Sequence, residues 1–351
     1  MKGLDLAEHF YTQVIEPLVR VRHTACLLGE GSEVLGFDTA RSRDHEWGPR
    51  VQLLVAHDDI DGVRARVDAG LPDTFKGFDV RWFSLATGTI THHVEVASLD
   101  EWLRRQLGFD PGRPMSSARW LATPQQRLLH VTAGRVFRDD DGDLERVRRD
   151  LAWYPPDVWR WMMSSSWHLI GNTQPLRARC LETGDLLGAP LLTARLCRMI
   201  MDLAFLQQRR YHPYDKWYGA AFAELPIAAT LSPLISTAVS TPDQADATAA
   251  LNAALATLGE RHNTLDLTAV VSPQMGRFDV GINDARRPYD VINASDYIES
   301  LRDSIDDPAL RGSIPVGAID QLTHADDAVV THTDWPERLY RAYRGPSAAG
   351  I

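Results

Sequence analysis

The chain has 351 residues and a formal net charge of −10 at pH 7, with 44% hydrophobic and 8% aromatic residues. An acidic chain lacks the basic face that phosphate neutralisation needs, which argues against a nucleic-acid-coating protein, and the apolar content excludes global disorder. No apolar run approaches the roughly 20 residues that span a bilayer, and the first residues do not begin a signal peptide. Three cysteines without paired metal spacing are typical of thiols in a reducing compartment. We therefore expect a cytoplasmic protein without a membrane segment.

The length allows two domains at roughly 100–200 residues each. The two halves of the sequence also differ in the secondary structure that they predict, which favours that division. Residues 1–150 predict an α/β (α+β) domain with a mixed sheet: runs at 24–28, 51–55, 79–83 and 93–96 read as strands, and 59–69 and 99–107 read as helices. Residues 151–351 predict a mainly α-helical domain, with long helical patterns at 191–210 and 242–258. Pro155-Pro156 marks the expected joint, and 177–188 is expected to be a polar loop between helices.

The most informative stretch joins the first two predicted strands. The first strand runs into Gly31-Ser32, a turn-rich loop follows, and Asp44-His45-Glu46 is expected to open the next strand. Gly31 lets the backbone approach a phosphate without a Cβ clash. Ser32 adds a hydroxyl at the start of an expected helix, whose free N–H groups favour anions. These features predict a phosphate site.

Asp44 and Glu46 supply the charge that such a site would need. Two residues apart on an extended strand, their side chains would lie on one face. Mg²⁺ prefers one or two carboxylates together with the phosphates of its substrate, and two such ions assist in-line displacement at phosphorus. By the same alternation His45 points to the opposite face, and Asp38 is expected to shape the loop.

Gly31-Ser32 followed by Asp44-x-Glu46 resembles the signature of the polymerase-β-like nucleotidyltransferases, the superfamily that includes aminoglycoside and lincosamide resistance enzymes. One departure is that Arg43 separates Ser42 from the first acid, where the common pattern has serine and acid adjacent. The wider chain is similar to a bacterial, largely actinobacterial family of unknown function, through the stretches 42–49, 120–129, 151–155, 210–217 and 317–321. The resemblance implies a nucleotidyltransferase fold for residues 1–150, two Mg²⁺ ions, and an NTP substrate, with ATP the expected nucleotide.

Members of that superfamily often carry a third acid on a neighbouring strand, as a metal ligand or as the base for the incoming hydroxyl. Two residues are candidates. Glu95 is flanked by strand-forming valines that would hold its carboxylate inward, where an acid without partners would indicate a metal or substrate nearby. Asp79 opens the predicted strand 79–83 and is the alternative.

Lysine is scarce in this chain: Lys2, Lys76 and Lys216 stand against 34 arginines, a bias typical of a GC-rich genome. Lys216 lies in an aromatic-rich segment that also contains Arg209 and Arg210. A compact ammonium suits a triphosphate oxygen, so these three cations are candidates for nucleotide contacts from the second domain. The alternative is that the arginines complement a helix C-terminus and the aromatic rings pack in a core.

Together these features predict a Mg²⁺-dependent nucleotidyltransferase with its site between the two domains. Asp44, Glu46 and Glu95 would be the metal ligands and catalytic acids, and Gly31, Ser32, Arg209, Arg210 and Lys216 would contact the nucleotide. The acidic charge favours a small hydroxylated acceptor over nucleic acid, and a protein acceptor stays open. The alternative is a catalytically silent, antitoxin-like nucleotide-binding module of the same fold, which the displaced serine favours. The sequence leaves the oligomeric state open.

Overall fold

The computed structural model describes residues 1–44, 47–85, 87–110, 114–279 and 286–323. Within that part the protein is mixed α/β and forms two compact units. Unit 1 contains residues 1–119 and 123–152, and unit 2 contains residues 120–122 and 153–323. No helix in the described ranges is long and apolar enough to cross a membrane.

Unit 1 is built around a five-stranded mixed sheet in the order β5-β6-β2-β1-β7. Its strands are β1 (Thr24–Leu27), β2 (Arg50–Leu54), β3 (Thr74–Phe75), β4 (Phe78–Asp79), β5 (Arg81–Ser84), β6 (Thr89–Ala97) and β7 (Arg135–Asp139), of which β3 and β4 form a separate hairpin. Its helices are α1 (Gly3–Phe10), α2 (Ile60–Gly70), α3 (Leu99–Leu107), α5 (Gln125–Thr132) and α6 (Asp143–Asp150), with short helical turns η1 (Tyr11–Ile15), η2 (Glu16–Leu18), η3 (Ala40–Asp44) and η4 (His57–Asp59). Helix α4 (Ser117–Leu121) crosses the boundary between the units.

Strand direction places the end of β1 and the start of β2 at one edge of this sheet. β1 pairs antiparallel with β2, and β2 pairs parallel with β6, to which it is connected through α2. Because β1 and β2 are antiparallel, whatever follows β1 and whatever precedes β2 must meet at the same edge. The two ends of the segment that carries Gly31, Ser32 and Asp44 therefore lie at that edge.

The two faces of the sheet have different surroundings. Val51, Leu53, Val94 and Val96 pack with α1 and α2 in the main core of the unit. The alternate residues Cys26, Gln52 and Glu95 lie on the opposite face, where α3 supplies the partner of Glu95. Strand side chains alternate between the two faces of a sheet. The odd-numbered apolar residues of β2 therefore lie in the core, and its even-numbered residues face the opposite side, where polar contacts are possible.

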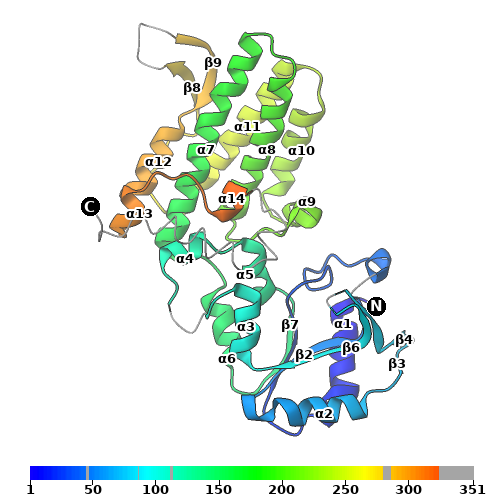
Figure 1. Cartoon of the computed structure of the whole chain (residues 1–351). Coiled ribbons are helices and arrows are strands. Elements are labelled where there is room, and N and C mark those ends of the chain that lie inside the picture. Colours follow the sequence, from blue (N-terminus) through cyan, green and yellow to red (C-terminus); the bar gives the residue numbers. More distant parts are fainter. Residues whose placement is uncertain (45–46, 86, 111–113, 280–285, 324–351) are drawn as a thin grey trace. The chain divides into compact units, whose positions relative to one another are not determined.

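Unit 2 is mainly helical (Figure 1). It contains α7 (Pro156–Glu182), α8 (Gly188–Gln207), α9 (Asp215–Ala223), α10 (Ala228–Ser240), α11 (Gln244–Asn263), α12 (Ala294–Asp303), α13 (Pro308–Gly312) and α14 (Ile319–Thr323), with a hairpin of β8 (Met275–Asp279) and β9 (Arg286–Ile292). The long helices α7, α8, α10 and α11 run side by side, and α12 packs on α7 (Figure 1). A Cβ on Gly171 of α7 would lie 2.7 Å from the Ala294 Cβ of α12, so glycine permits this close approach.

The structure confirms the predicted strands 24–28, 51–55 and 93–96 and the predicted helices 59–69 and 99–107, with small shifts of their ends. The predicted strand 79–83 divides between β4 and β5. Three expectations are wrong. No α-helix follows Ser32, because the chain makes only a turn that Gly36 ends at φ +81°. Asp44 does not open a strand but ends η3, and β2 begins at Arg50, after a proline that has no N–H for the ladder.

The third wrong expectation concerns residues 177–188, which we expected to form a loop. Residues 177–182 are instead the last residues of α7, and only the segment 183–187 connects α7 to α8. The polar residues that suggested a loop lie on the helix, where Arg177 is buried and hydrogen-bonded.

Candidate functional site

The turn after β1 is held in place from two sides. The Gln52 side chain accepts a hydrogen bond from Leu28 N (2.9 Å) and donates one to Leu28 O (3.1 Å), so it continues the strand pairing as a peptide group would. Gly29 N donates to His130 O at the end of α5 (2.8 Å). The chain therefore enters the turn at a fixed position.

Residues 31–37 then form a turn with unused hydrogen-bond donors. Phe37 N donates to Ser32 O (2.8 Å) and Gly36 N donates to Glu33 O (3.1 Å). The N–H groups of Ser32, Glu33 and Val34, and the Ser32 hydroxyl, donate no hydrogen bond to any described residue. Successive free N–H groups in a turn form a concave site for an anion. The turn therefore has the donors that a phosphate group requires.

A buried ion pair lies directly on this turn. Arg50, the first residue of β2, donates from Nε to Glu33 Oε1 (2.9 Å) and from Nη2 to the Glu30 carbonyl (2.6 Å). The Glu33 side chain is 3% exposed and that of Arg50 is 15% exposed. Gly31, at φ +134°, leaves no room for a Cβ, because that atom would overlap the Arg50 guanidinium and lie 2.7 Å from Glu33 Oε2. Sequence analysis did not find this pair, because its members are 17 positions apart and belong to no motif.

A second cation, Arg127 of α5, lies near the same turn. It is 3% exposed, it donates to Gln106 O (2.8 Å), and its Nε has no partner in the described part of the chain. Burial lowers the pKa of Arg127, and the charge of Glu30 acts in the opposite direction. A buried guanidinium with an unused donor is a candidate contact for a phosphate that binds at the turn. Arg127 belongs to the stretch 120–129, but sequence analysis gave it no role.

Asp38 ties the loop to the first helix. Its carboxylate accepts from Gly3 N (2.8 Å) at the start of α1 and from Trp47 Nε1 (3.4 Å), and it pairs with Lys2 (3.1 Å). Burial alone would raise the pKa of Asp38, but these hydrogen bonds hold it below its usual value. Asp38 therefore shapes the loop, as predicted, by capping α1.

The predicted metal ligands are only partly described. Asp44 ends η3, and its side chain lies outside the described structure, as do His45 and Glu46. No group of three His, Cys, Asp or Glu side chains that could hold a metal occurs among the residues that are described. Two carboxylates with substrate phosphates are enough for Mg²⁺, so Asp44 and Glu46 fit that ion by the chemistry of their oxygens and by their position before β2.

Glu95 lies on β6 opposite Gln52, two residues beyond the pair formed by Arg50 and His93. Its carboxylate accepts a hydrogen bond from Arg105 of α3, and its side chain is 35% exposed. The argument from a buried acid without partners therefore does not apply. Asp79, the alternative, ends β4 in the separate hairpin and is exposed.

The three predicted cations of unit 2 are all exposed. Arg209 lies 4.2 Å from the Trp159 ring, Arg210 lies 4.0 Å from the Glu224 carboxylate, and Lys216 Nζ lies 5.1 Å from the ring of its neighbour Trp217. The structure describes each unit separately, so the contact of these cations with a nucleotide stays a prediction.

Residues from four of the five family-like stretches lie together in unit 2. The Tyr154 ring lies 5.6 Å from the Trp120 ring and 5.3 Å from the Tyr211 ring. A pocket of about 190 Å³ is lined by residues of both 210–217 and 317–321, among them His212 and Asp320. The stretches that resemble the family therefore include residues that pack against one another in unit 2.

Comparison with known proteins reaches the same region. A family described as Domain of unknown function (DUF4037) matches residues 120–218, less than a third of the chain. No curated protein and no solved structure matches. The match contains the stretches 120–129, 151–155 and 210–217, and it brings with it neither an activity nor a ligand.

Proposed function

We propose that the protein is a Mg²⁺-dependent nucleotidyltransferase whose nucleotide phosphates bind at the turn 31–37. The observation that carries the proposal is the set of N–H groups at Ser32, Glu33 and Val34 and the Ser32 hydroxyl, which donate to no described residue and lie near the Arg50 guanidinium. The antiparallel pairing of β1 and β2 puts the start of β2 at the same edge of the sheet as the end of β1, and Asp44 and Glu46 precede β2 in the sequence.

In the proposed reaction an acceptor hydroxyl oxygen forms a bond to the α-phosphorus of the NTP. The bond from that phosphorus to the bridging oxygen breaks, pyrophosphate leaves, and the hydroxyl proton passes to a base or to water. Bound Mg²⁺ would neutralise the phosphate oxygens, and Asp44 and Glu46 would hold it. The free N–H groups and Arg50 would stabilise negative charge on the leaving phosphates. Glu95 can serve as the base only if its ion pair with Arg105 opens.

The test is label transfer from each α-³²P-labelled NTP to components of a cell extract with Mg²⁺ present. Wild-type protein should label an acceptor, whereas Asp44→Asn and Glu46→Gln should not. Asp61→Asn is the matched control, because that carboxylate is 97% exposed on α2 and pairs with Arg64 at the surface. Absence of label with all four NTPs, or equal labelling by Asp44→Asn, would refute the proposed activity.

A silent nucleotide-binding module is the second candidate, and one observation favours it. The Arg50–Glu33 pair already fills the space beside Gly31, and Arg50 already has a carboxylate partner. A module of this kind would be stabilised against heat by NTP and Mg²⁺ without transferring label. Thermal stabilisation without label transfer would therefore select the second candidate. If the protein shows neither stabilisation nor transfer, both candidates are excluded.

A further inference from the structure

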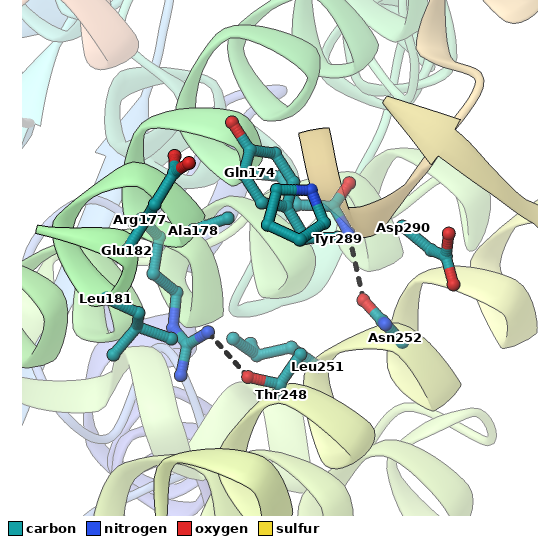
Figure 2. A pocket seen from close by; sticks show the side chains of 11 residues that line it. Gln174, Arg177, Ala178, Leu181, Glu182, Thr248, Leu251, Asn252, Tyr289 and Asp290 are labelled. Atoms are coloured by element: carbon teal, nitrogen blue, oxygen red, sulfur yellow. Dashed lines mark hydrogen bonds between the residues drawn. The ribbon is translucent and has the colours of Figure 1, made fainter. Parts of the chain in front are cut away.

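Unit 2 contains a pocket of about 330 Å³ between α7, α11 and β9 (Figure 2). Its volume is at the lower end of the range for small-molecule sites. The wall combines apolar side chains with a few polar ones: Gln174, Arg177, Ala178, Leu181, Glu182, Thr248, Leu251, Asn252, Pro288, Tyr289 and Asp290. Nothing proposed above for the Gly31 turn uses this pocket.

Arg177 is the one buried charge in the pocket wall, with 3% of its surface exposed. Its guanidinium donates to Thr193 of α8 (2.7 Å), to Thr248 of α11 (2.9 Å) and to Gln244 of α11 (3.2 Å). All three acceptors are uncharged. A guanidinium has five N–H donors, so two remain after these bonds are made.

The charges around the pocket do not balance. Glu182 pairs with Arg287 (3.2 Å), and Asp290 pairs with Arg277 (3.3 Å). The two acids of the wall are therefore paired with other arginines. Arg177 has no ion pair in the described part of the chain. Burying a cation without an opposite charge is costly, and this one lies in a protein of net charge −10. The uncompensated positive charge of Arg177 is therefore local to the pocket, and a bound anion would neutralise it.

Tyr289 adds a second unused donor. Its hydroxyl is buried and has no hydrogen-bond partner among the described residues, although the residue lines the pocket (Figure 2). Burial raises the pKa of Tyr289, so the hydroxyl keeps its proton near neutral pH and can donate it. The rings of Tyr289 and Pro288 and the side chains of Leu181 and Leu251 provide the apolar surface.

We propose that this pocket binds a small molecule with an oxyanion group, carboxylate or phosphate, on a compact apolar body. The oxyanion would pair with Arg177, and the apolar body would lie against Leu181, Leu251 and the ring of Tyr289, whose hydroxyl points away from the guanidinium (Figure 2). The proposal does not rest on nucleotidyl transfer, since no residue that lines this pocket belongs to the turn 31–37 or to the predicted nucleotide contacts.

Benzoate, benzamide and benzamidine test the charge of the ligand, because they share one shape and are negative, neutral and positive. Phenyl phosphate separates phosphate from carboxylate. Binding to the full chain is measured by calorimetry and by ligand-observed NMR. We expect at least one oxyanion probe to bind with a Kd of about 1 mM or below, and benzamide and benzamidine to bind at least about tenfold more weakly. Failure of both oxyanions to bind wild-type protein would overturn the proposal.

Three variants locate the site. Arg177→Gln should weaken oxyanion binding by at least about tenfold, the loss expected for a charge-assisted hydrogen bond. Thr193→Val removes one structural bond of Arg177 outside the pocket wall, so it should lower stability and keep the binding. Ala178→Trp fills the pocket and leaves the guanidinium bonds in place, so it should abolish binding even if Arg177→Gln does not fold. Unchanged affinity in Ala178→Trp would overturn the proposal.

Discussion

Gly31→Ala tests whether the turn after β1 is shaped by its own backbone or by the ion pair that lies on it. The positive φ of +134° alone costs an alanine about 1–3 kcal/mol. The new Cβ would also displace the Arg50 guanidinium, which is hydrogen-bonded to the buried Glu33 carboxylate. Loss of that charge-assisted contact adds about 1.5–3 kcal/mol, so we expect a total of about 2.5–6 kcal/mol.

Gly36→Ala is the matched control, because Gly36 has a positive φ of +81° and no atom within 4 Å of its expected Cβ. It should cost only the backbone term, about 1–2 kcal/mol. Two units need not unfold in one transition, so stability is best followed by hydrogen exchange in peptides from β1 and β2 during a urea titration. Equal losses in the two variants would refute the role of the ion pair. Removing the guanidinium in Gly31→Ala/Arg50→Ala should make the glycine substitution less costly than it is beside Arg50.

Three further substitutions test Asp38 and Gly134 in unit 1 and Lys216 in unit 2. Asp38→Asn should destabilise unit 1 at neutral pH; because the folded pKa of Asp38 is lowered, the difference from wild type should fade as the pH drops below about 4 and Asp38 is protonated. A difference that does not shrink as the pH falls below about 4 would contradict this. Gly134→Ala, whose Cβ would overlap the Leu27 carbonyl oxygen at φ +73°, should cost more than about 3 kcal/mol in a denaturation assay. Lys216→Arg should lower label transfer if a compact ammonium contacts phosphate; unchanged transfer would attribute this rare lysine to codon bias.

Local sequence predicted the elements whose own residues determine them. The apolar runs of β1, β2 and β6 and the helix α3 were found because alternation and helical spacing are local signals. The strand proposed at Asp44 failed because Pro49 has no N–H and delays β2 to Arg50. The loop proposed at 177–182 failed for a different reason: a polar sequence suggests exposure, but Arg177 is buried and its partners come from α8 and α11.

The residues of the candidate site also fall into those that local sequence indicates and those that depend on tertiary contacts. Gly31 and Ser32 were found because a glycine and a serine after a strand form a local motif. Arg50–Glu33, Arg127 and the hydrogen bonds of Gln52 to Leu28 depend on which strands and helices become neighbours, and spacing along the chain does not reveal this. Glu95 shows the opposite error: its valine neighbours indicated an inward acid, but the partner that neutralises it, Arg105, comes from the following helix.

Whether the turn can bind a phosphate depends on Arg50. This residue either keeps its ion pair with Glu33 or breaks that pair and binds the phosphate instead. If Arg50 changes partner, Glu33 competes with the nucleotide for one guanidinium, and Glu33→Gln removes the competing charge while keeping the shape. The difference between a charged and a neutral acceptor is about 1 kcal/mol, so we expect MgATP affinity to rise about fivefold. The measurement is calorimetric titration of wild type and Glu33→Gln, with Glu145→Gln as a control on α6, where the carboxylate lies 3.7 Å from the Arg148 guanidinium. If Arg50 is instead a fixed structural clamp, Glu33→Gln will lower stability and leave MgATP affinity unchanged, and the free N–H groups will have to hold the phosphate without it.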